Sequence, residues 1–208
     1  MKKFLIMLSL ILMTFTPCNA TFIEEGASVA VMDLGVHKGT NDPDINLLNA
    51  EGASSEYVIQ RLFQTKKFDV KDRTLVLDTL QKFNMVGLID PDTAQKIGEI
   101  LGVKYIVYGN VIDCVVDVDK SLVTVNTVKA HLVIRIMEVE TGNILMAAKG
   151  AGESASAFVG DSEKKFIVIG NTKVSQTSVH NALQKAAFQA TDILVERLFG
   201  AEKSKKKK

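Results

Sequence analysis

The sequence predicts an α/β protein with a mixed β-sheet, and three observations support this fold class. Residues 103–112 are apolar on both alternating faces, which indicates a central strand buried on both faces, with helices on at least one side. Three stretches before this strand and a long one near the end of the chain have apolar residues at helical spacing. Between them, long runs alternate between apolar and polar residues, which predicts an antiparallel meander.

The first twenty residues have the pattern of a secretory signal peptide. Lys2 and Lys3 precede a nearly unbroken apolar run over residues 4–15, and small residues follow at 18–20. This run is too short for an ordinary membrane-spanning helix. We therefore expect residues 1–20 to be removed by cleavage after Ala20, and the remaining protein to be exported.

Residues 21–200 form the predicted α/β domain, and they carry an excess of acidic groups. They contain 18 Lys and Arg against 23 Asp and Glu, a net charge of −5, because much of the basic charge lies at the two ends of the chain. An acidic domain argues against nucleic acid as the main partner. Residues 201–208 form a lysine-rich tail that we interpret as disordered and solvated; contact with an anionic surface is the alternative.

The first part of the domain is expected to begin with a buried strand over residues 28–35, interrupted by Asp33. A polar segment over 36–49 is expected to be a long loop, which is a common place for functional residues. The helical face expected over 54–64 consists of Tyr57, Val58, Ile59, Leu62 and Phe63. Residues 67–71 then alternate as a second strand.

Two capped helices are predicted before the central strand. Asp72 begins the first, whose expected apolar face consists of Leu75, Val76, Thr79, Leu80 and Phe83. Asp90, Pro91 and Asp92 begin the second, because they supply an N-cap, a proline in the first turn and a favourable negative charge. The second helix ends at Gly102, and its apolar face consists of Ala94, Ile97, Ile100 and Leu101.

The antiparallel meander is expected to follow the central strand. Residues 114–118 lead to a turn at 119–121, and a strand over 122–139 has an apolar face formed by Val128, Ala130, Leu132, Ile134 and Ile136. Its opposite face carries Lys129, His131, Val133 and Arg135, and is therefore expected to contact water or a partner. Residues 140–143 form a turn, and 144–148 return as a strand.

The last part of the chain divides into an irregular segment and a helix. Residues 150–176 are rich in Gly, Ser and Ala and are interpreted as an irregular excursion with room for an edge hairpin at 166–170. Residues 178–199 predict the long C-terminal helix. Its apolar stripe, expected to cover the sheet, consists of Val179, Leu183, Ala186, Ala187, Ala190, Ile193, Leu194 and Leu198.

No residue pattern predicts a catalytic, cofactor-binding or metal site. The histidines, His37, His131 and His180, lie far apart and outside any metalloprotease motif. Asp113, Asp117 and Asp119 lack the glycine and glutamate of an EF-hand, so a solvated turn is the favoured interpretation.

Two further features are weak evidence for catalysis or phosphate binding. Gly150 and Gly152 imitate only part of a phosphate-binding loop. Cys114 has apolar neighbours and is interpreted as a buried, inert thiol. These patterns indicate a protein that is not an enzyme.

Four segments of the chain occur in a characteristic order: VAVMDLG at 29–35, FDVKDRTLVLDTLQ at 68–81, AQKIGEILGVKYIVYGNV at 94–111 and RIMEVETGNILMAAKGAGES at 135–154. Together they resemble the CsgG-like family, which includes the curli secretion component of the outer membrane and penicillin-binding-protein activator lipoproteins. The resemblance implies an α/β domain in the periplasm or at the inner face of the outer membrane, which works by assembly rather than catalysis. It also implies structural roles for Asp33, Arg73, Gly102, Gly109 and Gly142.

Two departures from the family pattern bear on function. Members that form the secretion pore carry two long insertions, and a membrane hairpin needs about twenty residues. Residues 113–128 have room only for a short hairpin, which argues against a pore. Lipoproteins of the family have a small residue before the lipidated cysteine, whereas Phe15, Thr16 and Pro17 precede Cys18, so cleavage after Ala20 is favoured over lipidation at Cys18.

The resulting hypothesis is a non-enzymatic adaptor or activator of the cell envelope that binds another envelope protein and can form a homo-oligomer. Its candidate interaction surfaces are the loop at 36–49, the face with His131, Val133 and Arg135, and the excursion at 150–176. Contact with a membrane would require a lipid on Cys18 or the lysine tail. The alternatives are a curli-type secretion pore and, ranked last, an exported enzyme or small-ligand binder. No cofactor is expected.

Overall fold

The computed structural model describes residues 23–36, 50–87, 90–119, 124–157, 166–169 and 172–200. In this part of the chain a six-stranded mixed sheet has the order β3-β1-β4-β5-β6, with β2 paired to β4. The strands are β1 (Ala27–Val31), β2 (Gly35–Val36), β3 (Phe68–Val70), β4 (Tyr105–Asp119), β5 (Val125–Glu138) and β6 (Ile144–Ala157). The strand β1 runs parallel to β3 and β4, whereas β4, β5 and β6 form an antiparallel meander, so the predicted fold class is confirmed.

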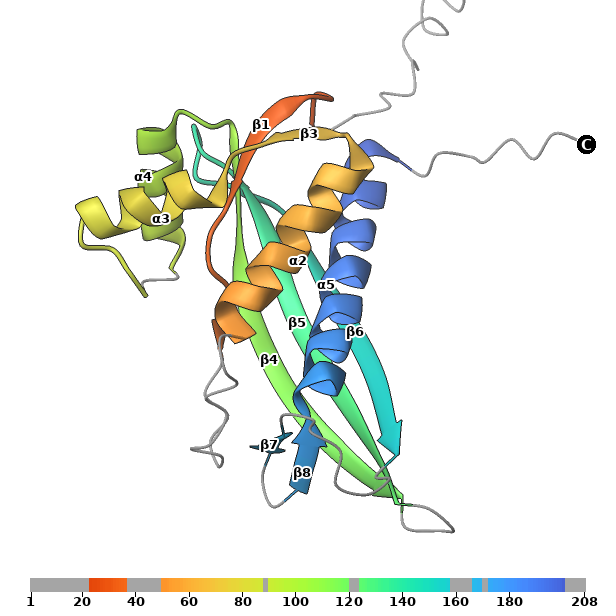
Figure 1. Ribbon diagram of the computed structural model, residues 1–208. Coiled ribbons are helices and arrows are strands. Elements are labelled where there is room, and N and C mark those ends of the chain that lie inside the picture. The colour runs from red at the N-terminus through yellow and green to blue at the C-terminus, as the bar shows by residue number, and fades with distance from the viewer. Residues whose placement is uncertain are drawn as a thin grey trace, which may run out of the picture.

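Helices cover both faces of the sheet, but not to the same extent (Figure 1). They are α2 (Ala50–Thr65), α3 (Arg73–Lys82), α4 (Pro91–Leu101) and α5 (Gln176–Phe199). The helices α2 and α5 lie side by side and enclose the larger core together with the inner residues of β4 and β5. A smaller core joins α3 and α4 to the other face, around Ile106 and Tyr108. The central strand is thus buried on both faces from Tyr105 to Gly109, as predicted, whereas Ile112 at its predicted end is 37% exposed.

The predicted helix boundaries are confirmed at three positions. Asp72 and Asp90 are the N-caps of α3 and α4, and each accepts a hydrogen bond from a backbone N–H group of the first turn. Gly102 ends α4 in the left-handed conformation, with φ of 61°. Local side-chain chemistry is sufficient to place these ends.

Several residues expected in the core are exposed instead: Phe63 (73%), Leu75 (50%), Phe83 (45%) and Ile100 (45%). Phe63, Leu75 and Ile100 lie beside the stripe of buried residues on their helices, and Phe83 is the C-cap residue after α3. In α3, for example, only Val76, Thr79 and Leu80 are buried. Helical spacing identifies an apolar face, but the width of its contact depends on the neighbouring elements.

The meander is longer and more regular than predicted. The strand β4 continues to Asp119 instead of ending at Ile112, and β6 continues to Ala157, so the expectation of an irregular segment is wrong for 150–157. The hairpin expected near 166–170 is present as β7 (Phe166–Ile169) and β8 (Thr172–Ser175), which form a separate two-stranded sheet. Antiparallel pairing along β5 supplies backbone partners that the composition of these segments does not reveal.

A β-bulge at Ile112 changes which residues of β4 face the larger core. The register shifts between Val111, which lies opposite Leu132, and Asp113, which lies opposite His131. Without the extra residue, strict alternation would point Asp113 inward and Cys114 outward. The bulge instead keeps Cys114 buried and places Asp113 beside His131 on the opposite face.

Two glycines of β6 allow very close packing between α5 and β6. A Cβ atom at Gly150 would overlap the carbonyl oxygen of Ala186 and lie 2.8 Å from Ala190 N, while one at Gly152 would lie 2.6 Å from Ala186 N. The helix meets these glycines with small residues, Ala182, Ala186 and Ala190, all fully buried. Gly150 and Gly152 therefore allow backbone contact between helix and strand, which explains the motif that imitates a phosphate-binding loop.

We predict that Gly150→Ala destabilises the protein by about 3 kcal/mol, because the added methyl group meets backbone atoms that cannot move independently. Gly→Ala in a strand would otherwise be favourable. The matched control is Ala151→Val, whose side chain lies on the exposed face of the same strand and should leave stability nearly unchanged. Urea unfolding measures both; an unchanged midpoint for Gly150→Ala would contradict the packing described here.

We also predict a specific pH dependence from the cap at Asp90. Hydrogen bonds from the Thr93 backbone N–H and hydroxyl lower the pKa of the Asp90 carboxyl group. The stabilisation is therefore present above the unfolded-state pKa of about 3.9 and is lost as pH falls through the lower folded-state pKa. Asp90→Asn keeps a capping side chain without this titration, whereas Asp90→Ala loses about 1 kcal/mol at pH 7. Between pH 5 and pH 2, Asp90→Asn should lose less stability than the wild type; equal losses would contradict the prediction.

Candidate functional site

One face of the meander is left uncovered by the described helices. Below the contact with α3 and α4, the outward side chains of β4, β5 and β6 form a surface that we call the open face. Figure 1 shows the three strands extending well beyond α3 and α4. Strand register places the following residues on the open face: Asn110, Asp113, Val115, Asp117, Lys129, His131, Val133, Arg135, Lys149, Ala151 and Glu153.

The candidate interaction residues His131, Val133 and Arg135 all lie on the open face, in the outward orientation that the alternating pattern predicts. Each is half-buried, while the intervening residues Leu132 and Ile134 are fully buried in the larger core. Their role as an interaction surface stays a prediction. Val115, 45% exposed, and Lys149 also lie on this face but were not expected there, because the predicted strands ended too early to include their positions in the pairing.

Acidic and basic side chains pair over the half of the open face that lies toward residues 120–124, which we call the lower half. His131 Nδ1 lies 2.6 Å from Asp113 Oδ1, and Lys129 Nζ lies 2.6 Å from Asp117 Oδ2. The hydrogen bond to Asp117 raises the pKa of Lys129, with further contributions from the charges of Asp117 and Glu153. The aspartates thus contact cationic side chains, and within the described ranges no group of His, Cys, Asp and Glu has the arrangement of a metal site.

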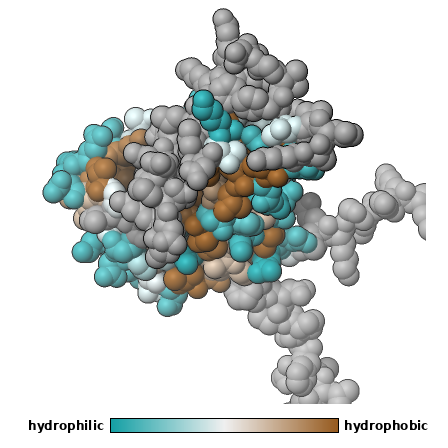
Figure 2. All heavy atoms as spheres, turned by 90° about the horizontal axis from the view of Figure 1, so that it is seen from below, coloured by the Kyte–Doolittle hydropathy of each residue, from teal (hydrophilic) through white to brown (hydrophobic). Residues whose placement is uncertain are grey.

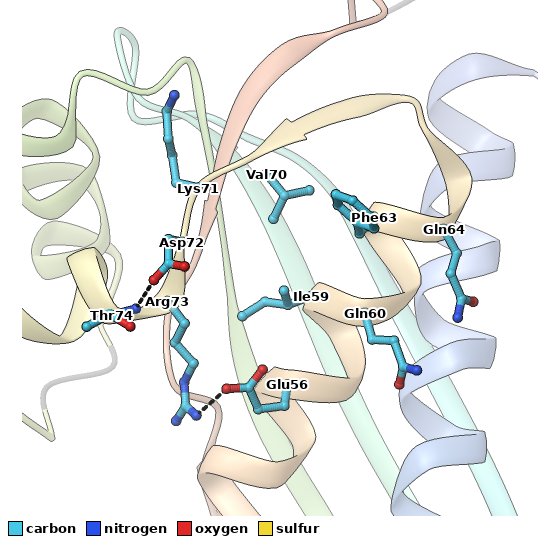
Figure 3. Close-up of a pocket in the computed structure, with 10 residues that line it drawn as sticks. All are labelled: Glu56, Ile59, Gln60, Phe63, Gln64, Val70, Lys71, Asp72, Arg73 and Thr74. Carbon is cyan, nitrogen blue, oxygen red and sulfur yellow. Dashed lines mark hydrogen bonds and ion pairs between the residues drawn. The ribbon is translucent and has the colours of Figure 1, made fainter.

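A second surface feature is a groove between α2 and the segment that joins β3 to α3 (Figure 3). Its cavity volume is ≈ 530 Å³, and its apolar lining consists of Ile59, Phe63 and Val70. Phe63, predicted to face the core, is 73% exposed here. Glu56 and Arg73 lie at one end of the groove, where a hydrogen bond joins them.

Arg73 and Asp33 form the centre of a charged network at this end of the groove. The Arg73 guanidinium donates from Nε and Nη2 to Asp33 Oδ1, at 3.2 and 2.7 Å, and from Nη1 to Glu56 Oε1, at 2.8 Å. Burial lowers the pKa of Arg73, but these bonds more than offset it, so the pKa is raised. The network ties the segment after β1 to α2 and α3, which fits the structural role that the resemblance implies for both residues.

The three glycines that the resemblance marks as structural occupy different settings. Gly102 ends α4, and Gly142 has φ of 69° in the turn between β5 and β6. Gly109 lies in β4, where a Cβ atom would overlap the carbonyl oxygen of Val133. Their importance for stability stays a prediction.

The remaining candidates do not converge on a reaction centre in the described residues. Burial, followed by the charge of Asp113, raises the pKa of Cys114 to about 12, so its thiol is protonated at neutral pH. His180 Nδ1 lies 3.2 Å from the Tyr57 hydroxyl, far along the chain from His131. Cys18, Ala20, His37, residues 37–49 of the predicted loop and the tail at 201–208 lie outside the described residues.

The helices of the described ranges do not have the length and apolar character needed to cross a membrane. Seen from below, the molecule presents hydrophobic side chains in patches separated by hydrophilic ones (Figure 2). The open face has the same mixed character, because Val115 and Val133 lie among charged neighbours.

Comparisons with known proteins give a family and several similar folds. The family described as "Curli production assembly/transport component CsgG" matches residues 42–208. No curated protein matches the chain. Among solved structures, the LpoB C-terminal domain from Salmonella enterica is 17% identical, with 62% of this chain and 84% of that chain covered and a TM-score of 0.43.

Two other solved structures have comparable similarity. Lipoprotein GNA1162 from Neisseria meningitidis is 20% identical, with 62% of this chain and 84% of that chain covered and a TM-score of 0.44. The PelC dodecamer from Paraburkholderia phytofirmans is 8% identical, with 81% and 88% covered and a TM-score of 0.40.

We predict that Arg73→Ala destabilises the protein by about 1.5 kcal/mol, because it leaves the half-buried Asp33 carboxylate without its charged donor. The matched control is Arg61→Ala, which removes the more exposed ion pair with Asp192 and should cost about 0.5 kcal/mol. Urea unfolding at neutral pH measures both. If the two substitutions cost the same, the Asp33–Arg73 network has no special structural role.

Proposed function

Because the chain belongs to the family of the curli production assembly/transport component CsgG, we propose that it is a non-enzymatic adaptor of the cell envelope that binds another envelope protein. In this proposal the protein works in the periplasm or at the inner face of the outer membrane, after export by the signal peptide at residues 1–20. It uses no cofactor, and assembly with further copies of itself is compatible with the same role.

The observation that carries this proposal is the open face. The inner residues of β5 are fully buried against α5, but the outward residues from Lys129 to Arg135 are only half-buried. The face also exposes Val115 between charged side chains. A rigid sheet surface that mixes apolar and charged groups is suited to a protein partner, which can bury the former and pair with the latter.

A particular feature favours an adaptor over the curli-type pore. Residues 113–128, where the family's first membrane hairpin would be inserted, provide sixteen residues for both strands and their connection, whereas a hairpin that spans a membrane needs about twenty.

The exported enzyme or small-ligand binder has less support than the adaptor. The apolar groove is open, and the charged groups at its end, Arg73 and Glu56, are already paired with each other. The Cys114 thiol is buried and protonated.

The proposal is tested by photo-crosslinking in the host cell. A photoreactive amino acid is placed at Val115 or Ala151 on the open face, and at Glu196 on the exposed side of α5 as the matched control. We expect the two open-face positions to crosslink to one envelope protein, identified by mass spectrometry, at least five times more efficiently than Glu196. Open-face crosslinking no stronger than that at Glu196 would overturn the proposal.

A further inference from the structure

The charges of the open face are unevenly distributed between its two ends. Toward the 120–124 connection, Asp113, Asp117 and Glu153 accompany Lys129 and His131, and they contact or face these cationic groups. Toward the turn at 140–143, the face carries Arg135 and Lys149. No carboxylate among the described residues forms an ion pair with Arg135 or Lys149. We call the latter region the basic end.

The sheet holds the two cations of the basic end close together. Arg135 lies opposite Ala147, and Val133 lies opposite Lys149, so Arg135 and Lys149 are diagonal neighbours on adjacent strands. Diagonal neighbours on one face are about 7–8 Å apart, which allows both side chains to contact one carboxylate or two adjacent ones. Val133 provides an apolar contact between them.

The neighbouring strand contributes a second unsatisfied polar group. Tyr108 lies directly opposite Arg135, is 3% exposed, and its hydroxyl has no hydrogen-bond partner among the described residues. Buried hydroxyl groups usually have a partner. Tyr108 belongs to the smaller core under α3 and α4, so the pair Tyr108–Arg135 marks the border between that core and the open face.

We infer that the basic end, formed by Arg135, Lys149 and Val133, receives an acidic segment of the partner protein. This inference rests on the proposed function and adds the chemistry of the partner: one or two carboxylates for the cations, flanked by an apolar side chain for Val133. Ion pairs with Arg135 and Lys149 steer the segment and fix its position along the strands, while the acidic lower half repels the same segment and prevents other registers.

Two other occupants fit the open face less well. An anionic membrane would meet Asp113, Asp117 and Glu153 on the same surface, so repulsion would oppose the attraction to two cations. A second copy could pair its acidic lower half with the basic end. However, Asp113 and Asp117 of that copy already contact His131 and Lys129, so these contacts would have to break before the carboxylates could pair with the basic end.

The inference is tested with the purified full chain without residues 1–20 and a fluorescein-labelled peptide of four Glu-Val repeats, by fluorescence anisotropy at 25 and 300 mM NaCl. We expect Arg135→Glu/Lys149→Glu to weaken binding at least tenfold at low salt, and the higher salt to weaken wild-type binding similarly. The matched control is Lys96→Glu/Lys173→Glu, with the same charge change at exposed positions outside the open face, which should bind like the wild type. Thermal unfolding checks that both variants fold.

Equal affinity of the two variants, or no binding by the wild type, would overturn the inference. The inference would also be overturned if the wild type binds vesicles of phosphatidylglycerol and phosphatidylcholine and the Arg135→Glu/Lys149→Glu variant does not. The site would then serve a membrane. A wild-type dimer in sedimentation experiments that dissociates in this variant would assign the site to a second copy instead.

The crosslinking experiment separates this inference from the proposed function. If Val115 still crosslinks to its envelope partner in the Arg135→Glu/Lys149→Glu background with undiminished yield, the adaptor proposal stands and the acidic-segment inference fails. If Val115 does not crosslink in the wild type, the adaptor proposal itself fails. A yield reduced at least fivefold in this background, and unchanged in the Lys96→Glu/Lys173→Glu background, supports both.

Discussion

Backbone contact between α5 and β6 is the constraint on which the rest of the structure depends. Gly150 and Gly152 let the helix approach the strand until its Ala186 backbone lies where a Cβ atom would otherwise be. This approach seals the larger core with small residues. It also brings helix side chains to the free edge of β6, where Gln189 accepts a hydrogen bond from the Ala151 N–H at 2.6 Å and Lys185 donates to the Glu153 carbonyl at 2.9 Å.

Those two side-chain bonds have a consequence for assembly. A long edge strand normally presents unpaired backbone groups to which another chain can add. Here α5 occupies such groups at Ala151 and Glu153, so strand addition along the middle of β6 would first have to break them. The open face, by contrast, is not covered by any of the described helices. Association through side chains on this face therefore fits the structure better than extension of the sheet at β6.

The β-bulge at Ile112 and the incomplete cover by α3 and α4 together create the open face. The bulge turns Asp113 toward His131 and keeps the Cys114 thiol inside, so the lower half of the face is charged while the core beneath it stays apolar. At the end of the groove, Arg73 donates hydrogen bonds to both Asp33 and Glu56. Charge is internally paired in that network, whereas Arg135 and Lys149 lack a carboxylate partner among the described residues.

The sequence by itself determined the local features of this protein. The caps at Asp72 and Asp90, the helix end at Gly102 and the outward positions of His131, Val133 and Arg135 follow from side chains a few residues apart, which interact through the local backbone. The α/β class followed from the same short periods. The resemblance carried by four segments named the family that the comparison then showed.

Only the tertiary structure decided the features that depend on distant partners. The strand character of residues 150–157 comes from pairing with β5, and the two glycines there are explained by α5, more than thirty residues later. Phe63 is exposed because it lines the groove between α2 and the segment that joins β3 to α3. The pairing of Lys149 with Val133, and hence the basic end, depends on register between strands. Such contacts join residues that no local pattern relates, because the free energy that fixes them comes from packing across the fold.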